Sequence, residues 1–379
     1  MCFSLVRGRG GAPEMRRLVV MSLVAAALSL SPVAARGDAR APARPALPDG
    51  PARAGFDVSR LEWGWHGTFA PFNVTRTRPV RDALAKGVIA VDTDVLVTDT
   101  PDGPLALLTE QMAYHHIAQG RTRGRDWLVT FCVVCNTAAR FTPTVGGTRT
   151  TFDTVGAYDG MMVMQDAATG TIWNHVTGDA LLGPAVGTSL GPPGNVLHVT
   201  VRQLLARAPE ARIAISDRVY FAGGRRHGTV EGISLFGRVY RPDGRFGLSN
   251  AFAATIGVED TRRPRMDLGL GIWSDASSRY YPRDRIREAG DVLIDRIDGR
   301  TLLVYLDPVT STPAALFVDA THARMDGAIV RLDNGSTVRD GVVYDSRGQR
   351  VAPDRPLQVF TRWYGFALTF PGTPIVGGP

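Results

Sequence analysis

The sequence has few cysteines, almost no lysine and no long apolar run beyond its first 30 residues. Only three cysteines occur among 379 residues, and Lys86 is the only lysine among 43 basic residues. No basic stripe with interleaved aromatic residues is present, so we expect no nucleic-acid partner. No segment after residue 30 is long and apolar enough to predict a transmembrane helix in the mature chain.

Common catalytic signatures are missing as well. The sequence contains no serine nucleophile elbow, no glycine loop of the phosphate-binding type and no His-Glu-x-x-His helix. These absences argue against the usual hydrolase, nucleotide-binding and metalloprotease classes. Four aspartates lie in predicted turns, where aspartate commonly initiates the turn, so we interpret them as structural: Asp153, Asp159, Asp166 and Asp179.

The N-terminal residues predict export. Met15-Arg16-Arg17 precedes an apolar run over 18–30 and small residues up to Ala35, which is typical of a secretory signal. We therefore predict a signal peptide over 1–35, starting at Met15, and a periplasmic or extracytoplasmic location. An uncleaved N-terminal anchor is the alternative. Residues 36–54 are rich in Pro, Ala and Arg and predict a disordered linker.

The rest of the chain predicts a β-rich α+β fold. Glycine and proline are plentiful, with 42 and 25 residues, and apolar residues make up 44%. We expect strands and helices over the following ranges: strands over 88–91, 96–98, 127–132, 148–152, 161–164 and 301–306, helices over 107–117 and 199–208, and a tight turn over 166–170.

The second half repeats the pattern of the first. Residues 301–306 resemble 127–132, 314–317 resemble 138–141, and 360–370 resemble 198–208. This predicts an internal duplication: a first half-domain over 55–215 and a degenerate second one over 216–379, each with mixed or antiparallel sheets and a few helices. The second copy lacks cysteines where the first has two. We therefore infer that the cysteines belong to a functional site and are not required by the repeated fold.

Cys132 and Cys135 are the one concentrated chemical feature. A Cys-x-x-Cys pair can bind a soft metal, cycle as a redox dithiol or close as an inert disulfide, and the sequence leaves all three open. A disulfide over so short a loop stabilises little. Thiolate, imidazole and thioether ligands suit copper, with zinc as the alternative, so we place copper first. The further ligand candidates are His115, with His116, Met162 and Met164 as weaker ones.

The segment around the cysteines resembles the DUF3179 family, a group of exported or membrane-anchored proteins of unknown function. The likeness is carried by His115-His116, the segment Thr130-Phe131-Cys132-Val133-Val134-Cys135-Asn136-Thr137-Ala138, the stretch Met164 to Trp173, and Gly183-Pro184-Ala185-Val186-Gly187. The resemblance implies a shared site at Cys132 and Cys135 and favours His115 over His116 by spacing. It supplies no reaction, and the substrate or other ligand is open.

The resemblance also implies structural motif residues and shows departures. Asp166, Thr169, Gly170, Trp173, Gly183 and Gly187 match the family's turn motifs. His116 stands where the family has Glu, Val133-Val134 where it has Pro-Leu, and Asn136 where it has Gly. Losing the proline should alter the turn, and losing the glycine removes an easy positive-φ position.

Overall fold

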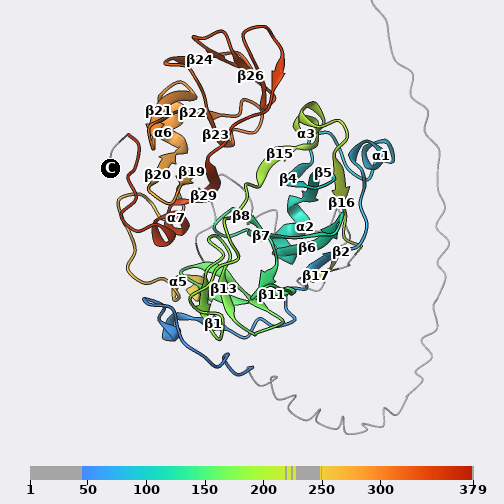
Figure 1. Cartoon of the computed structure of the whole chain (residues 1–379), viewed down its shortest axis with the longest axis vertical. Coiled ribbons are helices and arrows are strands. Elements are labelled where there is room, and N and C mark those ends of the chain that lie inside the picture. The colour runs from blue at the N-terminus through green and yellow to red at the C-terminus, as the bar shows by residue number, and fades with distance from the viewer. Residues whose placement is uncertain (1–44, 218–219, 223–224, 228–247, 249, 378–379) are drawn as a thin grey trace, which may run out of the picture. The chain divides into compact units, whose positions relative to one another are not determined.

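Short antiparallel strands joined by tight turns dominate the chain, and all its helices are short. The computed structural model describes residues 45–217, 220–222, 225–227, 248 and 250–377 (Figure 1). The predicted β-rich α+β class is confirmed. Described residues belong to one compact unit, Arg44–Pro379. No helix in these residues has the length and apolarity to span a membrane.

The same order of elements occurs twice: a β-hairpin, a helix, then a three-stranded meander (Figure 1). The first copy comprises β4 (Asp94–Thr100), β5 (Gly103–Leu108), α2 (Thr109–His115), β6 (Ile117–Thr122), β7 (Arg125–Cys132) and β8 (Thr137–Phe141). The second comprises β19 (Leu268–Trp273), β20 (Ser278–Pro282), α6 (Arg283–Glu288), β21 (Val292–Ile297), β22 (Arg300–Leu306) and β23 (Pro313–Phe317).

Each copy also contains an inserted meander and a returning strand that continues into a helix. The inserts are β11–β14, over Phe152–Tyr158, Met161–Asp166, Ile172–Asn174 and Ala180–Leu182, and β24–β28, over Ala323–Asp326, Ile329–Leu332, Thr337–Arg339, Val342–Tyr344 and Arg350–Val351. The return units are β15 (Leu197–Thr200) with α3 (Val201–Arg207) and β29 (Leu357–Arg362) with α7 (Trp363–Thr369). β15 pairs antiparallel with β4, and β29 pairs antiparallel with β19.

The two copies also share a backbone hydrogen bond at the start of the return helix. The N–H of Val201, which begins α3, donates to Thr93 O. At the start of α7, the N–H of Trp363 donates to Asp267 O. Each bond connects a return helix to the residue immediately before the first strand of its own copy. The repeated order and these bonds are what an internal duplication produces.

The remaining elements precede the first copy, lie within it or separate the two copies along the sequence. They are η1 (Val58–Arg60), β1 (Glu62–Trp63), β2 (Phe72–Val74), β3 (Arg78–Pro79), α1 (Val80–Ala85), β9 (Thr144–Val145), β10 (Thr148–Arg149), β16 (Arg212–Ala214), β17 (Tyr220–Ala222), β18 (Arg225–His227) and α5 (Asn250–Ala253). β1 extends the insert into the sheet β1-β11-β12-β13-β14, and β2 pairs in parallel with β6.

Several predicted elements are confirmed, and others are wrong or shorter. The strands at 96–98, 127–132, 161–164 and 301–306 and the turn at 166–170 are present. Residues 88–91 form no strand, because they turn the chain from α1 into β4, with the Ala90 N–H bonded to the Thr93 hydroxyl. Of 148–152, only Thr148–Arg149 is a separate strand, and Phe152 already starts β11.

Both predicted helices are shorter because strands run directly into them. Residues 107–108 end β5 and residue 117 starts β6, which leaves Thr109–His115 for α2. α3 begins at Val201 because Thr200 caps it in a reciprocal capping box with Gln203. Periodicity alone does not reveal such strand–helix junctions.

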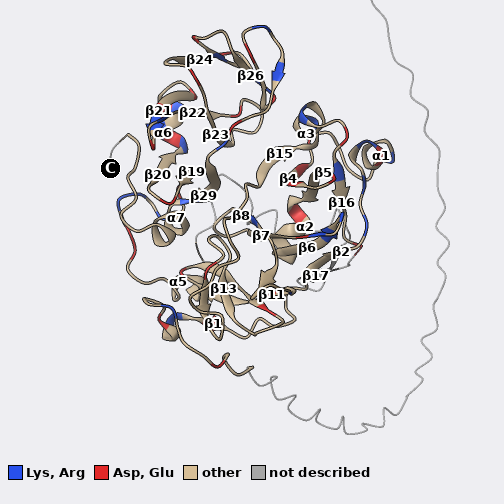
Figure 2. Cartoon of the chain, viewed as in Figure 1, with Lys and Arg blue, Asp and Glu red and all other residues tan. Residues whose placement is uncertain are grey.

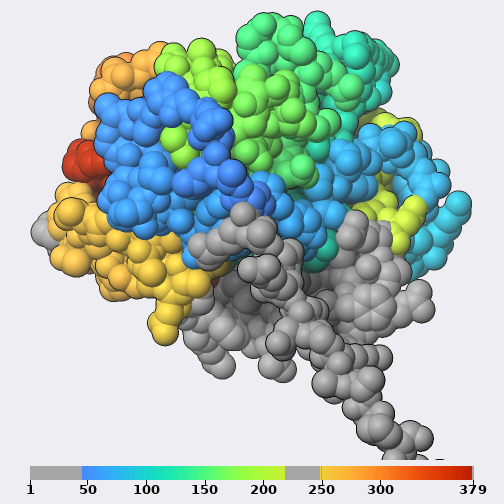
Figure 3. All heavy atoms as spheres, turned by 90° about the horizontal axis from the view of Figure 1, so that it is seen from below, coloured from blue at the N-terminus to red at the C-terminus, as the bar shows by residue number. Residues whose placement is uncertain are grey.

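The N-terminal predictions fall mostly outside the described residues. The predicted signal, 1–35, and residues 36–44 lie there. The rest of the predicted linker follows strand β14: Ala52 bridges to Leu182 and the Arg53 N–H donates to Leu181 O. In Figure 3 this first described segment, in blue, lies on the surface against green segments of the first copy. Residues of both charge signs are interspersed along the described elements (Figure 2).

A candidate metal centre

Cys132 and Cys135 lie at the turn between β7 and β8, Cys132 just before it and Cys135 within it. Cys132 is the last residue of β7, and residues 133–136 form the turn. Asn136 adopts φ 59°, a region that asparagine tolerates better than most residues other than glycine. Its side-chain amide also donates to Phe360 O at 3.1 Å. Asn136 therefore adopts a positive φ at the position where the resembling family has glycine.

The second copy of the repeat holds this turn in place. The Arg362 N–H and the Thr361 hydroxyl donate to Cys135 O, at 2.9 and 3.1 Å. The buried Arg362 guanidinium donates through Nε to Val134 O at 3.0 Å and through Nη1 to Met266 O at 2.8 Å. The backbone of the Cys-x-x-Cys turn is thus fixed by residues more than 220 positions away in the sequence.

His175 reaches the cysteines from the inserted meander, just beyond β13. Asp166 organises the turn before it, because its carboxylate accepts from the Thr169 N–H and hydroxyl, the Thr171 N–H and the Trp173 indole. Trp173 itself is fully buried. The Thr130 hydroxyl then donates to His175 O at 2.9 Å, which fastens the histidine backbone to β7.

The other motif residues support the same meander. Gly170 and Gly183 have φ of +71° and +123°, and a Cβ on Gly183 would lie 2.9 Å from the Thr171 backbone. Gly183 therefore allows the chain to approach the turn that Asp166 organises. Gly187 has φ +96° and open space around it. Asp166, Thr169, Gly170, Trp173 and Gly183 thus act indirectly, by shaping the strands that lead to His175.

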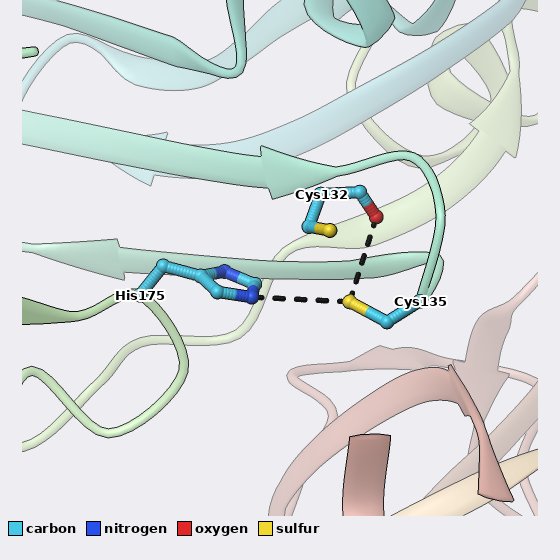
Figure 4. Close-up of side chains that lie close together, drawn as sticks. All are labelled: Cys132, Cys135 and His175. Carbon is cyan, nitrogen blue, oxygen red and sulfur yellow. Dashed lines mark hydrogen bonds between the residues drawn. The ribbon is translucent and has the colours of Figure 1, made fainter. Parts of the chain in front are cut away.

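The three side chains form a compact ligand group. The sulfurs of Cys132 and Cys135 and a His175 ring nitrogen all lie within 4.8 Å of one another. Cys135 Sγ is 3.8 Å from His175 Nε2, and all three residues are at most 1% exposed (Figure 4). With bonds of ~2.3 Å to sulfur and ~2.05 Å to nitrogen, that separation corresponds to an S–metal–N angle of about 120°. Cys135 Sγ and His175 Nε2 therefore lie at a separation at which both can bind the same ion.

The two thiols differ in their protonation. Burial raises the pKa of Cys132, but hydrogen bonds to its sulfur from the Cys135 thiol and from backbone N–H groups, including that of Met162, lower it to about 7 overall. Burial raises the pKa of Cys135 well above its usual value, and its role as donor to Cys132 adds to this. Cys132 is therefore the thiol of the pair that loses its proton first. Both cysteines are free thiols in the structure.

His175 is neutral and has one unused nitrogen. Burial, with a smaller contribution from the charge of His116, lowers the pKa of His175 to about 3, so the imidazole is available as a ligand. Its Nδ1 is buried and has no hydrogen-bond partner among the described residues. His175 also lines a pocket of about 340 Å³ together with Met161, Met162, Asp159 and Asp179. This pocket gives a route from the surface towards the ligand group.

The structure places the histidines predicted from sequence elsewhere. His115 Nδ1 donates to Ala70 O at 2.6 Å, and its ring stacks on Phe72. His115 is therefore not part of the ligand group; His175 is in that position. His116 Nδ1 donates to Phe131 O at 3.0 Å, and burial lowers its pKa to about 4. Its charge affects His175, so it lies near the group without belonging to it.

The methionines predicted as weaker ligands surround the cysteines. Met162 and Met164 are buried in the same apolar cluster as Cys132 and Cys135, along with Met161. The Met162 backbone N–H bonds to the Cys132 sulfur. His175 is not among the ligand candidates that the sequence predicted. Its one signal was its position two residues after Trp173, at the end of the motif stretch.

The second copy builds the corresponding turn without cysteine. β22 ends at Leu306, as β7 ends at Cys132, and Asp307 is the first residue of the turn that follows. Ser311 in this turn has a positive φ of 54°, as Asn136 has in the Cys-x-x-Cys turn with 59°. The Asp307 carboxylate accepts from the N–H groups of Val309 and Thr310. Because aspartate completes this turn, the fold itself does not require thiols there.

The fold and the site define a class: an α+β protein with a repeated order of elements, in which one repeat carries a buried group of two thiols and an imidazole. The chain belongs to the family described as Protein of unknown function (DUF3179), which it matches over residues 76–369. This match covers most of the chain and includes both copies of the repeat. No curated protein and no solved structure matches the chain.

Proposed function

We propose that this protein binds a soft metal ion through Cys132, Cys135 and His175, with Cu(I) ahead of Zn(II). The grouping of these three ligand atoms within 4.8 Å of one another carries the proposal. Thiolates and imidazole suit both ions. The thioethers of Met161, Met162 and Met164 in the same cluster favour copper, because thioethers are soft ligands.

Two features support a functional rather than a structural role for the pair. The corresponding turn in the second copy folds around Asp307, so the cysteines meet no demand of the scaffold. The His175 ring contacts Cys135 Sγ through Nε2, and its Nδ1 has no hydrogen-bond partner in the described part of the chain. A histidine that binds a metal usually donates from its second nitrogen as well, and His175 is one of the residues that line the pocket of about 340 Å³.

We further propose that the protein acts outside the cytoplasm. The charged start, apolar run and small-residue end over 15–35 support export. An exported Cys pair encounters an oxidising compartment unless a bound metal or a dedicated reductant protects it. Metal binding is consistent with a pair of free thiols in such a compartment.

The test is a Cu(I) titration of anaerobically purified protein against a competing chelator. Wild type is expected to bind one equivalent, and Cys132→Ser/Cys135→Ser none. His175→Asn should weaken binding at least tenfold, whereas His115→Asn, the matched change at the histidine favoured by sequence, should leave it within about twofold. Binding by wild type that equals that of the double-serine variant would overturn the proposal. If His115→Asn weakened Cu(I) binding and His175→Asn did not, the third ligand would be His115.

A second candidate, a thiol–disulfide redox protein, is favoured by the asymmetry of the two thiols. A lowered pKa at Cys132 beside a raised one at Cys135 resembles an attacking and a resolving cysteine. The burial of both sulfurs argues against it, because exchange requires access to a partner. Incubation with glutathione redox buffers distinguishes the two: a cycling pair gives a reversible intramolecular disulfide, and a metal site stays reduced once it is loaded.

A further inference from the structure

A second cavity, of about 820 Å³, lies between the first copy and the insert of the second. α3 and β15 contribute Leu204 and Leu197 to its wall, and the second insert contributes Val342 and Val343. Its size falls within the range of ligand pockets, and its wall is largely apolar with a few polar groups. It contains none of the residues of the candidate metal centre.

The polar part of this cavity is unusually basic. Four arginines line it, Arg140, Arg207, Arg350 and Arg355, against the one acid Asp99. Arg207 and Arg350 donate to backbone carbonyls, those of Asp340 and Arg207. Arg140 and Arg355 make no side-chain hydrogen bond or ion pair to any residue that the structure describes. The cavity therefore presents guanidinium groups that lack a carboxylate partner.

These charges repel one another. Burial lowers the pKa of Arg207; the charge of Arg355 lowers it further, while Tyr305, Asp307 and Asp340 act in the opposite direction. Arginine remains protonated at any ordinary pH, so the repulsion persists in the free protein. An anion bound between the guanidinium groups would relieve it.

A small polar recess shares this wall. A cavity of about 30 Å³ is lined by Arg207 and Arg355 and also by Tyr305 and His198. The Tyr305 hydroxyl and His198 Nδ1 are buried and lack hydrogen-bond partners within the described residues. A recess of this size holds about two water molecules. It therefore offers polar atoms, directly or through water, to a group bound at the two arginines.

We propose that this cavity binds a small organic anion, whose phosphate or carboxylate groups are held by Arg140, Arg207 and Arg355 and whose apolar part lies against Leu204 and Val342. Guanidinium groups bind both oxyanions through paired N–H donors, which explains the choice of arginine over lysine. The site is independent of the metal centre, so metal binding and anion binding can be tested separately.

The test is isothermal titration with two probes, pyrophosphate and citrate, each against sodium chloride of equal ionic strength. Saturable binding of one of them is expected; pyrophosphate would indicate a phosphate ester, and citrate a polycarboxylate. Arg140→Gln/Arg355→Gln should weaken binding at least tenfold, since it removes two charged groups that donate paired hydrogen bonds to the anion. Arg125→Gln/Arg202→Gln removes equal charge from exposed positions outside the cavity and should change binding less than twofold.

Either of two results would overturn the site. One is no saturable binding of either probe beyond the chloride control. The other is an equal loss in the cavity variant and the surface variant, which would indicate only general charge attraction. Thermal unfolding checks that the cavity variant is folded. If it is not, Arg140→Lys/Arg355→Lys keeps the charge and should still weaken binding, because lysine lacks the paired donors.

Discussion

Gly365 packs against Cys135 at the position that Gln203 occupies in the other copy of the repeat. Both are the third residue of a return helix. Gln203 Nε2 donates at 2.7 Å to Asp307, the first residue of the turn between β22 and β23, which corresponds to the Cys-x-x-Cys turn. A Cβ on Gly365 would lie 3.2 Å from Cys135 Cβ and 3.4 Å from Met161 Sδ. The third residue of the return helix therefore places a side chain beside the turn that contains Asp307. Gly365, at the same position in the other return helix, places none beside the Cys-x-x-Cys turn.

This relationship predicts that a side chain at 365 disturbs the metal centre without removing a ligand. Gly365→Gln should lower Cu(I) affinity at least tenfold, because the side chain is pushed into the space around Cys135 and Met161. Gly365→Ala should have a smaller effect, since only one tight contact has to relax. Chelator competition measures both. Unchanged affinity in Gly365→Gln would show that the space beside Cys135 has no part in binding.

The hydrogen bonds of Arg362 predict that the second copy stabilises the Cys-x-x-Cys turn. Arg362→Leu removes the donors to Val134 O and Met266 O, and losing these two part-buried charged hydrogen bonds should cost about 3 kcal/mol of stability. Arg362→Lys retains the charge but not both bonds and should cost less. Urea unfolding measures the loss. Equal stability of wild type and Arg362→Leu would contradict the idea that this residue holds the turn.

Asp166 should influence the site from a distance. Asp166→Asn replaces one acceptor oxygen by an amide that faces the donors of Thr169, Thr171 and Trp173, and should cost about 2 kcal/mol of stability. Metal affinity should fall as well, because β13 leads to His175. Asp153→Asn, an exposed position on the neighbouring strand β11, is the control and should change neither quantity. A stability loss with full metal affinity would show that His175 is positioned independently.

Sequence patterns predicted the parts of this structure that depend on neighbouring residues. The β-prone run 127–132 gave β7 and placed Cys132 at its end, and Asp166 with Gly170 gave the turn. The repeat was visible because both copies keep similar local patterns. Strand–helix junctions such as Thr200 were missed because the apolar pattern runs through them without a break.

The third ligand could not be found in the same way. His115 has the favoured spacing from the cysteines, but the parallel pairing of β2 with β6 brings residues 70–72 against it, and Ala70 O and Phe72 bind its ring. His175 comes from an inserted meander whose position depends on pairing between distant strands. The contacts of Arg362 and Gly365 with the turn likewise depend on how the two copies pack, which no local pattern encodes.

His198 predicts acid sensitivity of the contact between the copies. Its ring lies between Phe131 of the first copy and Phe360 of the second, and burial lowers its pKa from 6.5 to about 4. Between these two values the unfolded chain binds the proton and the folded chain does not. Stability is therefore full above about pH 6.5 and falls as the pH drops towards 4, by about 3 kcal/mol from this residue.

His198→Gln should flatten this dependence, because glutamine cannot take up the proton. Urea unfolding at pH 4.5, 5.5 and 7 should show a smaller loss on acidification than in wild type, whatever the variant's stability at pH 7. The slope that remains comes in part from His116 and His175, which are also buried with lowered pKa values. His322→Gln changes an exposed histidine and should keep the wild-type slope. Parallel pH profiles for wild type and His198→Gln would show that this imidazole accepts its proton without leaving its position between the two phenylalanines.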